Sequence, residues 1–401
     1  MSRLRLIKVA QPSTPASNES AVFVDTATRR LTQIDDFGVV NQLTDLSSYN
    51  YLRNAGHWFA QRQAPATVTT YSNLTGRSIG ADGWGITNEN ASATYQRTDT
   101  LGAPESGLTA QYYGQYIKTT SNGKLFVSQV IESKDVGKLK GRTVRFQCKL
   151  KTLIGASATL KMSVIQLTSA GTVDAIPATF ISAVGANGVD PTLGTSLAYL
   201  VPKSGVTPDN ATAQTSNVSC SVNTTWQRFG FVVDIPTTAK NIIIMIHSDS
   251  QLTATNGFAI SESYLTEGYE TQEWCPQSFS EEFLRVKRYY QKTFQYDVAP
   301  AQNAGLLGAL RFPVTTVGAV ANSIIGVWNF PIQLRIAPIT TIFYNPSASN
   351  AFARNVTMST DATATSGVNP SDVGIDINAT GLLAWAIGNE IKLHCTVDSE
   401  L

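Results

Sequence analysis

The sequence predicts an all-β protein, and three observations support this prediction. Charged residues account for 15% of the 401 residues, well below the roughly 25% of average globular domains. Threonine, serine, glycine and β-branched residues are abundant, which favours strands joined by many turns. Many short stretches alternate apolar and polar residues, as strands do in antiparallel sheets with one face toward solvent.

Composition also limits the possible functions. A chain of this length with 42% apolar residues can form two or three domains. The formal net charge of +1 argues against broad electrostatic binding to nucleic acid or an anionic membrane. The N-terminal residues lack the apolar stretch of a signal peptide, and the longest apolar run, Ile242–Ile246, is too short to span a bilayer. We therefore expect a soluble protein that is assembled in the cytoplasm.

Residues 1–48 predict a small meander of three strands. The strands contain Val22 and Val24, then Leu31 to Ile34, then Val39 and Val40. Three short strands bury too little surface to be stable alone, so this segment needs a partner or other copies of the chain. The Pro/Ser-rich sequence QPSTPASNES, residues 11–20, is typical of an extended arm.

Residues 49–280 predict an antiparallel β-sandwich. In RTVRFQCKL the apolar residues fall on one face of a strand and the polar residues fall on the other. The stretch ATLKMSVIQL alternates in the same way, with Lys161 and Ser163 on its polar face. Long turn-rich spacers separate such strands, as in sandwiches with one solvent-facing side on each sheet. The apolar face of RTVRFQCKL holds Val144, Phe146, Cys148 and Leu150.

Residues 281–401 begin with a charged segment and continue as a second β-sandwich. The segment SEEFLRVKRYYQKTF predicts a short helix with Ser280 as its N-cap. After Tyr290 the period changes to two, so the helix leads into a strand that extends to Val298. Further on, FPIQLRIAPITTIFYNP predicts a strand pair whose prolines require sheet edges or bulges.

The sequence shows no catalytic or metal-binding motif. The three histidines and four cysteines lack metal-ligand spacing, so we expect free and mostly buried thiols, no metal and no cofactor. Nucleophile-elbow, P-loop and dinucleotide-binding patterns are also missing. We therefore expect no enzymatic activity. Two distant carboxylates could still form a glycosidase site, and the sequence alone leaves that alternative open.

The central region resembles the carbohydrate-binding jelly-roll modules of bacteriophage virion proteins. Four pieces carry the resemblance: Asn54 to Gln63, the ADGW of Ala81 to Trp84, the pair LFVSQVIE and LKGRTVRFQCKLK, and GFAISESYLTEGYE before the charged segment. The C-terminal region, with FPIQLRIAPITTIFYNP, resembles the β-domain that follows RYY segments in phage fibre proteins.

The resemblance implies a fibre or appendage exposed on the surface of a bacteriophage virion, on the tail or the head. It would be a homotrimer that attaches through residues 1–48 to portal, tail or capsid proteins and adheres to host cell-surface polysaccharide. Sugar recognition uses aromatic faces and hydrogen-bonding amides, and the candidate glycan-binding residues are Trp84, Tyr112, Tyr113 and Tyr116. The alternative is a capsid decoration or collar protein with a purely structural role and no glycan ligand.

Overall fold

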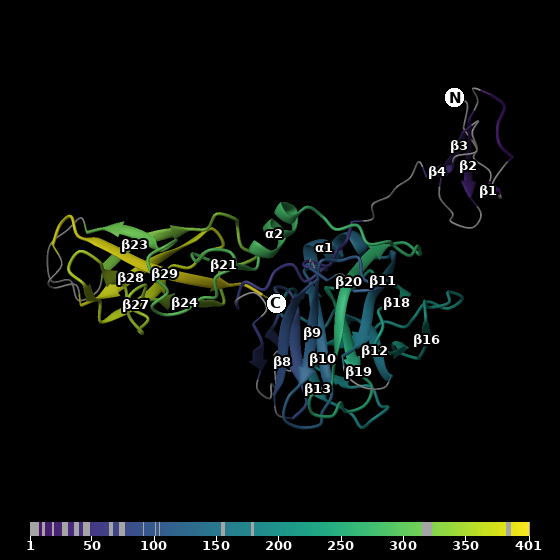
Figure 1. Ribbon diagram of the computed structural model, residues 1–401, viewed down its shortest axis with the longest axis horizontal. Coiled ribbons are helices and arrows are strands. Elements are labelled where there is room, and N and C mark those ends of the chain that lie inside the picture. Colours follow the sequence, from purple (N-terminus) through teal and green to yellow (C-terminus); the bar gives the residue numbers. More distant parts are fainter. Residues whose placement is uncertain are drawn as a thin grey trace. The chain divides into compact units, whose positions relative to one another are not determined.

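The computed structural model confirms an all-β protein with two short helices among the residues that it describes (Figure 1). It forms two compact units, Met1–Asn50 and Tyr51–Leu401. The predicted regions 49–280 and 281–401 thus lie within one unit, although each has its own hydrophobic core. The described residues are 8–9, 13–17, 20–25, 31–35, 40–42, 49–63, 67–71, 77–90, 92–100, 102–103, 105–153, 157–177, 180–314, 323–381 and 386–400.

The N-terminal unit contains the predicted meander. Strands β2 (Ser20–Asp25), β3 (Leu31–Asp35) and β4 (Val40–Gln42) pair antiparallel in sequence order. A further strand, β1 (Lys8–Val9), pairs parallel to β2 and was not predicted. The side chains of Phe23 and Ile34 are buried. The connections between these strands, residues 26–30 and 36–39, lie outside the described residues, as does the predicted strand residue Val39.

The central region is a sandwich of two antiparallel sheets. The eight-stranded sheet has the order β16 (Ala211–Ala213), β17 (Val218–Val222), β12 (Ala158–Leu167), β19 (Asn241–Ser248), β10 (Leu125–Ile131), β7 (Gly85–Asn88), β6 (Ser78–Ile79), with β15 (Leu197–Tyr199) beside β12. The six-stranded sheet has the order β18 (Gln227–Asp234), β11 (Thr143–Thr152), β20 (Gly257–Glu267), β9 (Tyr112–Lys118), β8 (Ala93–Asp99), β5 (Thr69–Tyr71). A short helix, α1 (Ser133–Leu139), connects β10 to β11 and was not predicted.

The core between the two sheets follows the predicted alternation. Val144, Phe146, Cys148 and Leu150 of β11 are all fully buried in one apolar cluster. Leu160, Met162 and Val164 of β12 belong to the same cluster, which confirms the predicted apolar face of that strand as well.

The outer face of the eight-stranded sheet does not face solvent, which corrects the sequence prediction. Phe126, Ile165 and Met245 on this face form a second apolar cluster with Phe180. The covering segment holds the strand pair β13 (Ile181–Ala183) and β14 (Thr192–Leu193). Lys161, predicted to face solvent, is therefore buried and forms ion pairs with Asp190 and Asp249. Strand periodicity reports one strand at a time and cannot show that a distant segment covers it.

The charged segment forms helix α2 (Phe279–Lys287), as predicted, but its N-cap is Ser278 rather than Ser280. Ser278 has extended backbone angles, and its hydroxyl accepts a hydrogen bond from the Glu281 N–H. The Glu281 carboxylate accepts a bond from the Ser278 N–H in return, which completes a capping box. The following strand β21 (Tyr290–Lys292) ends well before Val298.

The C-terminal region is a second sandwich built around strand β29 (Glu390–Asp398). The β29 sheet also contains β21, β22 (Leu310–Pro313), β24 (Thr340–Tyr344), β25 (Arg354–Asn355) and β26 (Thr360–Asp361). The facing sheet has the order β23 (Ser323–Asn329), β28 (Gly374–Thr380), β27 (Ala364–Val368).

The predicted strand pair around the prolines is wrong in part. Within the stretch FPIQLRIAPITTIFYNP, residues 330–339 are irregular and Thr340–Tyr344 forms a strand. Pro331 and Pro338 have no N–H to donate to a sheet, so the chain leaves the sheet between β23 and β24.

Three of the four cysteines are buried free thiols, in agreement with the prediction, and Cys275 is exposed. No helix in the described part of the chain is long and apolar enough to cross a membrane.

Candidate functional site

The four predicted glycan-binding residues occupy different environments. Trp84 and Tyr116 are fully buried, Tyr113 is nearly so, and Tyr112 is partly exposed. The Trp84 indole donates a hydrogen bond to the Asn54 carbonyl (3.0 Å) and stacks on His57. A ring without exposed surface offers no face to a sugar, so Trp84 and Tyr116 serve the core in this structure.

The outer face of the six-stranded sheet carries one of the two remaining candidates, Tyr113. Strand register places Gln96 of β8 beside Gln115 of β9, Gln115 beside Ala259 of β20, and Ala259 beside Lys151 of β11. In the neighbouring row Thr98 lies beside Tyr113. Small Ala259 leaves room above the middle of the sheet, where Tyr113 and the indole of Trp226 pack.

Tyr113 and Trp226 form a fixed polar cluster with Glu105. The two rings meet edge to face with centroids 5.2 Å apart. Glu105 accepts hydrogen bonds from the Tyr113 hydroxyl (2.5 Å) and the Trp226 indole N–H (2.9 Å), and it pairs with the Lys151 ammonium. The Lys151 ammonium also lies 4.8 Å from the Tyr113 ring centroid. Gln115 donates to the Tyr113 hydroxyl from the more open side (3.2 Å).

Electrostatics in this cluster favour charged Glu105 and neutral Tyr113. Burial opposes ionisation of Glu105, but hydrogen bonds from Lys151, Tyr113 and Trp226 outweigh it and lower the pKa of the carboxyl. Burial and the bond to Glu105 raise the pKa of Tyr113 to about 12. A general acid for glycoside cleavage needs a raised carboxyl pKa, so Glu105 has the wrong tendency for that role.

A second carboxylate, Glu262, holds the loop that follows Glu105. The register of β20 against β11 shifts here, and Glu262 has a φ of +48°, which is uncommon for a residue with a side chain. Its carboxylate accepts from the N–H groups of Thr109 and Ala110 (2.5 and 2.8 Å) and pairs with Lys149 (2.7 Å). The loop is therefore fixed to the sheet at both of its ends.

The other half of the same face is crossed by residues 269–275. Gln147 of β11 makes two hydrogen bonds with the backbone of Gln272, at 2.6 and 2.9 Å. The Tyr264 hydroxyl accepts from the Cys275 N–H (2.6 Å). The less covered part of the sheet is therefore the β8–β9 side, where Gln96, Thr98 and Gln115 lie.

Tyr112 lies on the opposite side of β9, at the end of the sandwich. The Arg97 guanidinium sits 4.8 Å from its ring centroid, and the Gln111 amide donates to its hydroxyl (2.8 Å). Arg97 also donates to the Trp58 carbonyl (2.5 Å) and approaches the Tyr296 hydroxyl (3.4 Å). Tyr112 therefore belongs to the contact between the sandwich and the segment after α2, separate from Tyr113.

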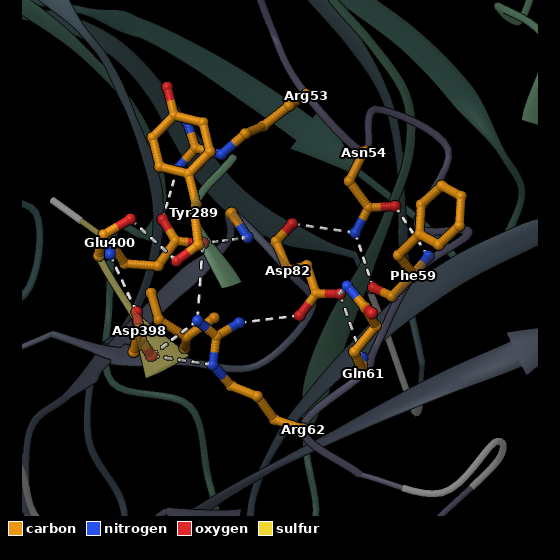
Figure 2. A network of polar contacts seen from close by, with 12 residues as sticks. Arg53, Asn54, Phe59, Gln61, Arg62, Asp82, Tyr289, Asp398 and Glu400 are labelled. Carbon is orange, nitrogen blue, oxygen red and sulfur yellow. Dashed lines mark hydrogen bonds and ion pairs between the residues drawn. The ribbon is translucent and has the colours of Figure 1, made fainter. Parts of the chain in front are cut away.

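A buried network of charges joins distant parts of the chain, and sequence reasoning missed it (Figure 2). The Arg62 guanidinium forms ion pairs with Asp82 and Asp398, both at 2.8 Å. Arg53 pairs with Glu400 at 2.6 Å, and its guanidinium lies 3.7 Å from the Tyr289 ring centroid. Figure 2 shows these side chains converging from the sandwich and from the end of β29. The partners are up to 347 residues apart, so no local pattern marks them.

Burial shapes the charges of this network. Burial alone would raise the pKa of Glu400, but Arg53, Arg62 and Arg77 outweigh it and lower that pKa. Burial raises the pKa of Asp82, although Arg62 and Gln61 oppose the shift. Within the described residues, no group of three His, Cys, Asp or Glu side chains could hold a metal ion.

Comparison with known proteins gives no family assignment. No family model matches the chain, and no curated protein matches it. Solved structures of carbohydrate-binding modules and of a phage tailspike domain are similar to it at low identity.

Three of these structures illustrate the range. A TmCBM61 module in complex with β-1,4-galactotriose shares 10% identity over 55% of this chain and 100% of that chain (TM-score 0.29). A putative sugar binding protein from Bacteroides thetaiotaomicron shares 15% over 55% and 100% (TM-score 0.33). The enzymatically active domain of bacteriophage CBA120 tailspike protein 4 shares 13% over 55% of this chain and only 21% of that chain (TM-score 0.30). At these scores the likeness carries no functional argument, and the all-β assignment rests on the strands described above.

Proposed function

We propose that the protein is a bacteriophage virion fibre or appendage whose central sandwich binds host surface glycans. The supporting observation is the difference between the two outer faces of the sandwich. The face of the eight-stranded sheet is covered by an apolar segment around Phe180. The face of the six-stranded sheet instead carries the amides of Gln96 and Gln115 beside the edge of the Tyr113 ring, which is the chemistry that sugar recognition uses.

The proposed glycan site centres on Gln96, Gln115 and the edge of Tyr113. Trp226 and Lys151 form one wall, because Glu105 holds both in place. Groups that are fixed before binding lose little conformational entropy when a ligand arrives. The aromatic surface that remains exposed here is small, so single-site affinity should be weak, and several copies acting together would make it useful.

A homotrimer is part of the proposal, and exposed aliphatic side chains of the C-terminal sandwich support it. Large contiguous apolar patches are uncommon on monomeric soluble proteins and often mark contact surfaces. Closed cyclic symmetry would let three copies cover these residues. They include Leu307, Ile324, Val327, Ile339, Ile342 and Val373.

Attachment to the particle is assigned to residues 1–48. The few short strands of this segment bury little surface among themselves. We expect portal, tail or capsid proteins to bury the remaining apolar surface. A chain that lacks residues 1–45 should fold and remain soluble but fail to enter particles. Normal incorporation of that chain would contradict the assignment.

A capsid decoration or collar protein without a glycan ligand is the second candidate. The observation that favours it is the deep burial of Tyr113 and Trp226, which leaves little aromatic surface for a sugar. A glycan array with the full chain and with Gln115→Ala decides between the two. Binding that the variant weakens supports the adhesin, and no binding by the unmodified chain at high density supports the decoration protein.

A further inference from the structure

The end of strand β29 enters the sandwich instead of stopping within its own sheet. Up to Asp398 the strand pairs with β21 and β24. The backbone of Ser399 then makes two contacts outside β29: its N–H donates to the Tyr289 carbonyl (2.8 Å), and its carbonyl accepts from the Arg335 Nε (3.1 Å). One residue further on, the Glu400 side chain bonds to residues of the central sandwich: Arg53, Gly83 and Arg62.

The Glu400 carboxylate fits a preformed site in the sandwich. One oxygen accepts from the Gly83 N–H (3.0 Å) and the other accepts from Arg53 (2.6 Å). Arg53 is itself held by the Val130 carbonyl (2.9 Å). Gly83 has a φ of +86°, and a Cβ there would lie 2.8 Å from the Arg53 Nε, so a larger residue does not fit this turn.

The apolar cores take little part in this connection. The sandwich core ends at Leu265, and the C-terminal core begins at Phe312. In the described part of the chain, neither cluster contains a residue of α2 or β21. The helix is instead held by Phe59, whose ring lies 5.3 Å from that of Phe283, and by polar contacts such as Arg288 with Glu132 (3.2 Å). Each sandwich can therefore keep its core when the connection opens.

We propose that residues 398–400 form a strap that locks the C-terminal sandwich and helix α2 against the central sandwich. Asp398 and Glu400 supply the two carboxylates of the strap, and Arg62 and Arg53 are their anchors. Removing one charge of a buried ion pair leaves the other without compensation, so loss of the Glu400 carboxylate leaves Arg53 without its ion-pair partner in the contact. Arg62 would keep its ion pair with Asp82 if Asp398 were lost. The strap therefore acts as a two-state element: closed, it fixes the two sandwiches as one arm, and open, it leaves two folded bodies joined by the α2 segment.

The test is amide hydrogen exchange on the full chain carrying Glu400→Gln, which keeps the shape of the side chain and removes its charge. Exchange of the α2 and β21 amides should become at least tenfold faster, while amides of β11 and β28 keep their original rates. Small-angle scattering should show a broader distribution of distances within the chain. Unchanged exchange in α2 would overturn the proposal, because the aromatic contacts alone would then hold the helix.

Two further variants separate the strap from general destabilisation. Glu390→Gln removes the ion pairs with Arg311 and Lys392 (both 3.2 Å), which have similar chemistry but lie outside the contact, and it should leave the rates of α2 and β21 unchanged. Deletion of residues 399–401 should reproduce the effect of Glu400→Gln. If either strap variant accelerates β11 and β28 as much as α2, or unfolds the chain, the cores depend on these residues and the strap proposal is wrong.

Discussion

The imidazole of His57 lies against the indole of Trp84, with ring centroids 5.1 Å apart and an angle of 26° between the planes. His57 has a φ of +54° and no exposed surface, and Tyr95 and Tyr116 enclose it from other sides. Burial lowers the pKa of His57 to about 3, so the ring is neutral at physiological pH. The residue thus completes the core beneath β8 and β9.

We expect the buried histidines to make the protein sensitive to mild acid. A folded-state pKa of about 3 lies below the unfolded value of about 6.5. The stabilisation is therefore complete above pH 6.5 and is lost as pH falls toward 3, by about 1.4 kcal/mol per pH unit for one group. His247, with a pKa lowered by burial to about 4, acts in the same direction. The free energy of unfolding, measured with denaturant at pH 7, 5.5 and 4.5, should therefore decrease as the pH is lowered.

The control for this effect is His57→Asn, since asparagine tolerates a positive φ better than most residues. The variant should be less stable at pH 7 but should lose less stability between pH 6.5 and 4.5. Equal slopes in the two proteins would show that His57 does not set the acid response.

Gly114 of β9 leaves space for the ring of His57, and we expect Gly114→Ala to be destabilising. A Cβ at this position would lie 2.8 Å from two atoms of the His57 ring, which is fully enclosed and cannot withdraw. Overpacking of this kind typically costs about 1–3 kcal/mol. The matched control is Gly137→Ala in helix α1, where a Cβ meets no atom within 4 Å and alanine favours the helix. The two unfolding temperatures should be compared by thermal unfolding. An equal change in unfolding temperature for both variants would contradict the packing around Gly114.

Strand periodicity predicted the parts of the fold that are set by neighbours in sequence, and missed those set by distant segments. Val144 and Phe146 of β11 face the core as expected, because alternation in a strand is local. Burial of Lys161 depends on Asp190 and Asp249, and burial of Arg53 depends on Glu400, 347 residues away. A lone sequence contains no signal for such pairs.

The candidate site shows the same limit. Tyr112 and Tyr113 are adjacent in sequence, and both were predicted to bind glycan, but they lie on opposite faces of β9. Aromatic content drew attention to β9, whereas the face on which each ring lies depends on how β8, β20 and the loop at Glu105 pack around the strand.

Substitution of Trp84 should affect the stability of the fold, whereas substitution of Gln115 should affect adsorption to host cells. Trp84→Ala removes a fully buried ring and should cost about 3–5 kcal/mol in the free energy of unfolding. Gln115→Ala changes a partly exposed amide and should alter stability by less than about 0.5 kcal/mol while weakening adsorption to host cells. Chemical denaturation and an adsorption assay on the same preparations test this. If Gln115→Ala adsorbs normally, the glycan site does not include the β8–β9 face.

The last prediction concerns salt. The cations around the proposed glycan site are paired within the fold: Lys151 with Glu105, Lys149 with Glu262 and Arg145 with Asp209. The formal net charge of the chain is +1, so long-range attraction to a charged ligand is also small. Binding through hydrogen bonds and ring contacts should therefore change little between 50 and 300 mM salt, a range over which screening removes most attraction between exposed charges. We expect adsorption to vary by less than about twofold over this range, the dependence that a balanced set of charges implies. A tenfold or larger loss of adsorption at the higher salt concentration would contradict this expectation. It would mean that charged residues elsewhere on the chain bind the host surface, and that the ligand is an acidic polymer recognised outside the β8–β9 face.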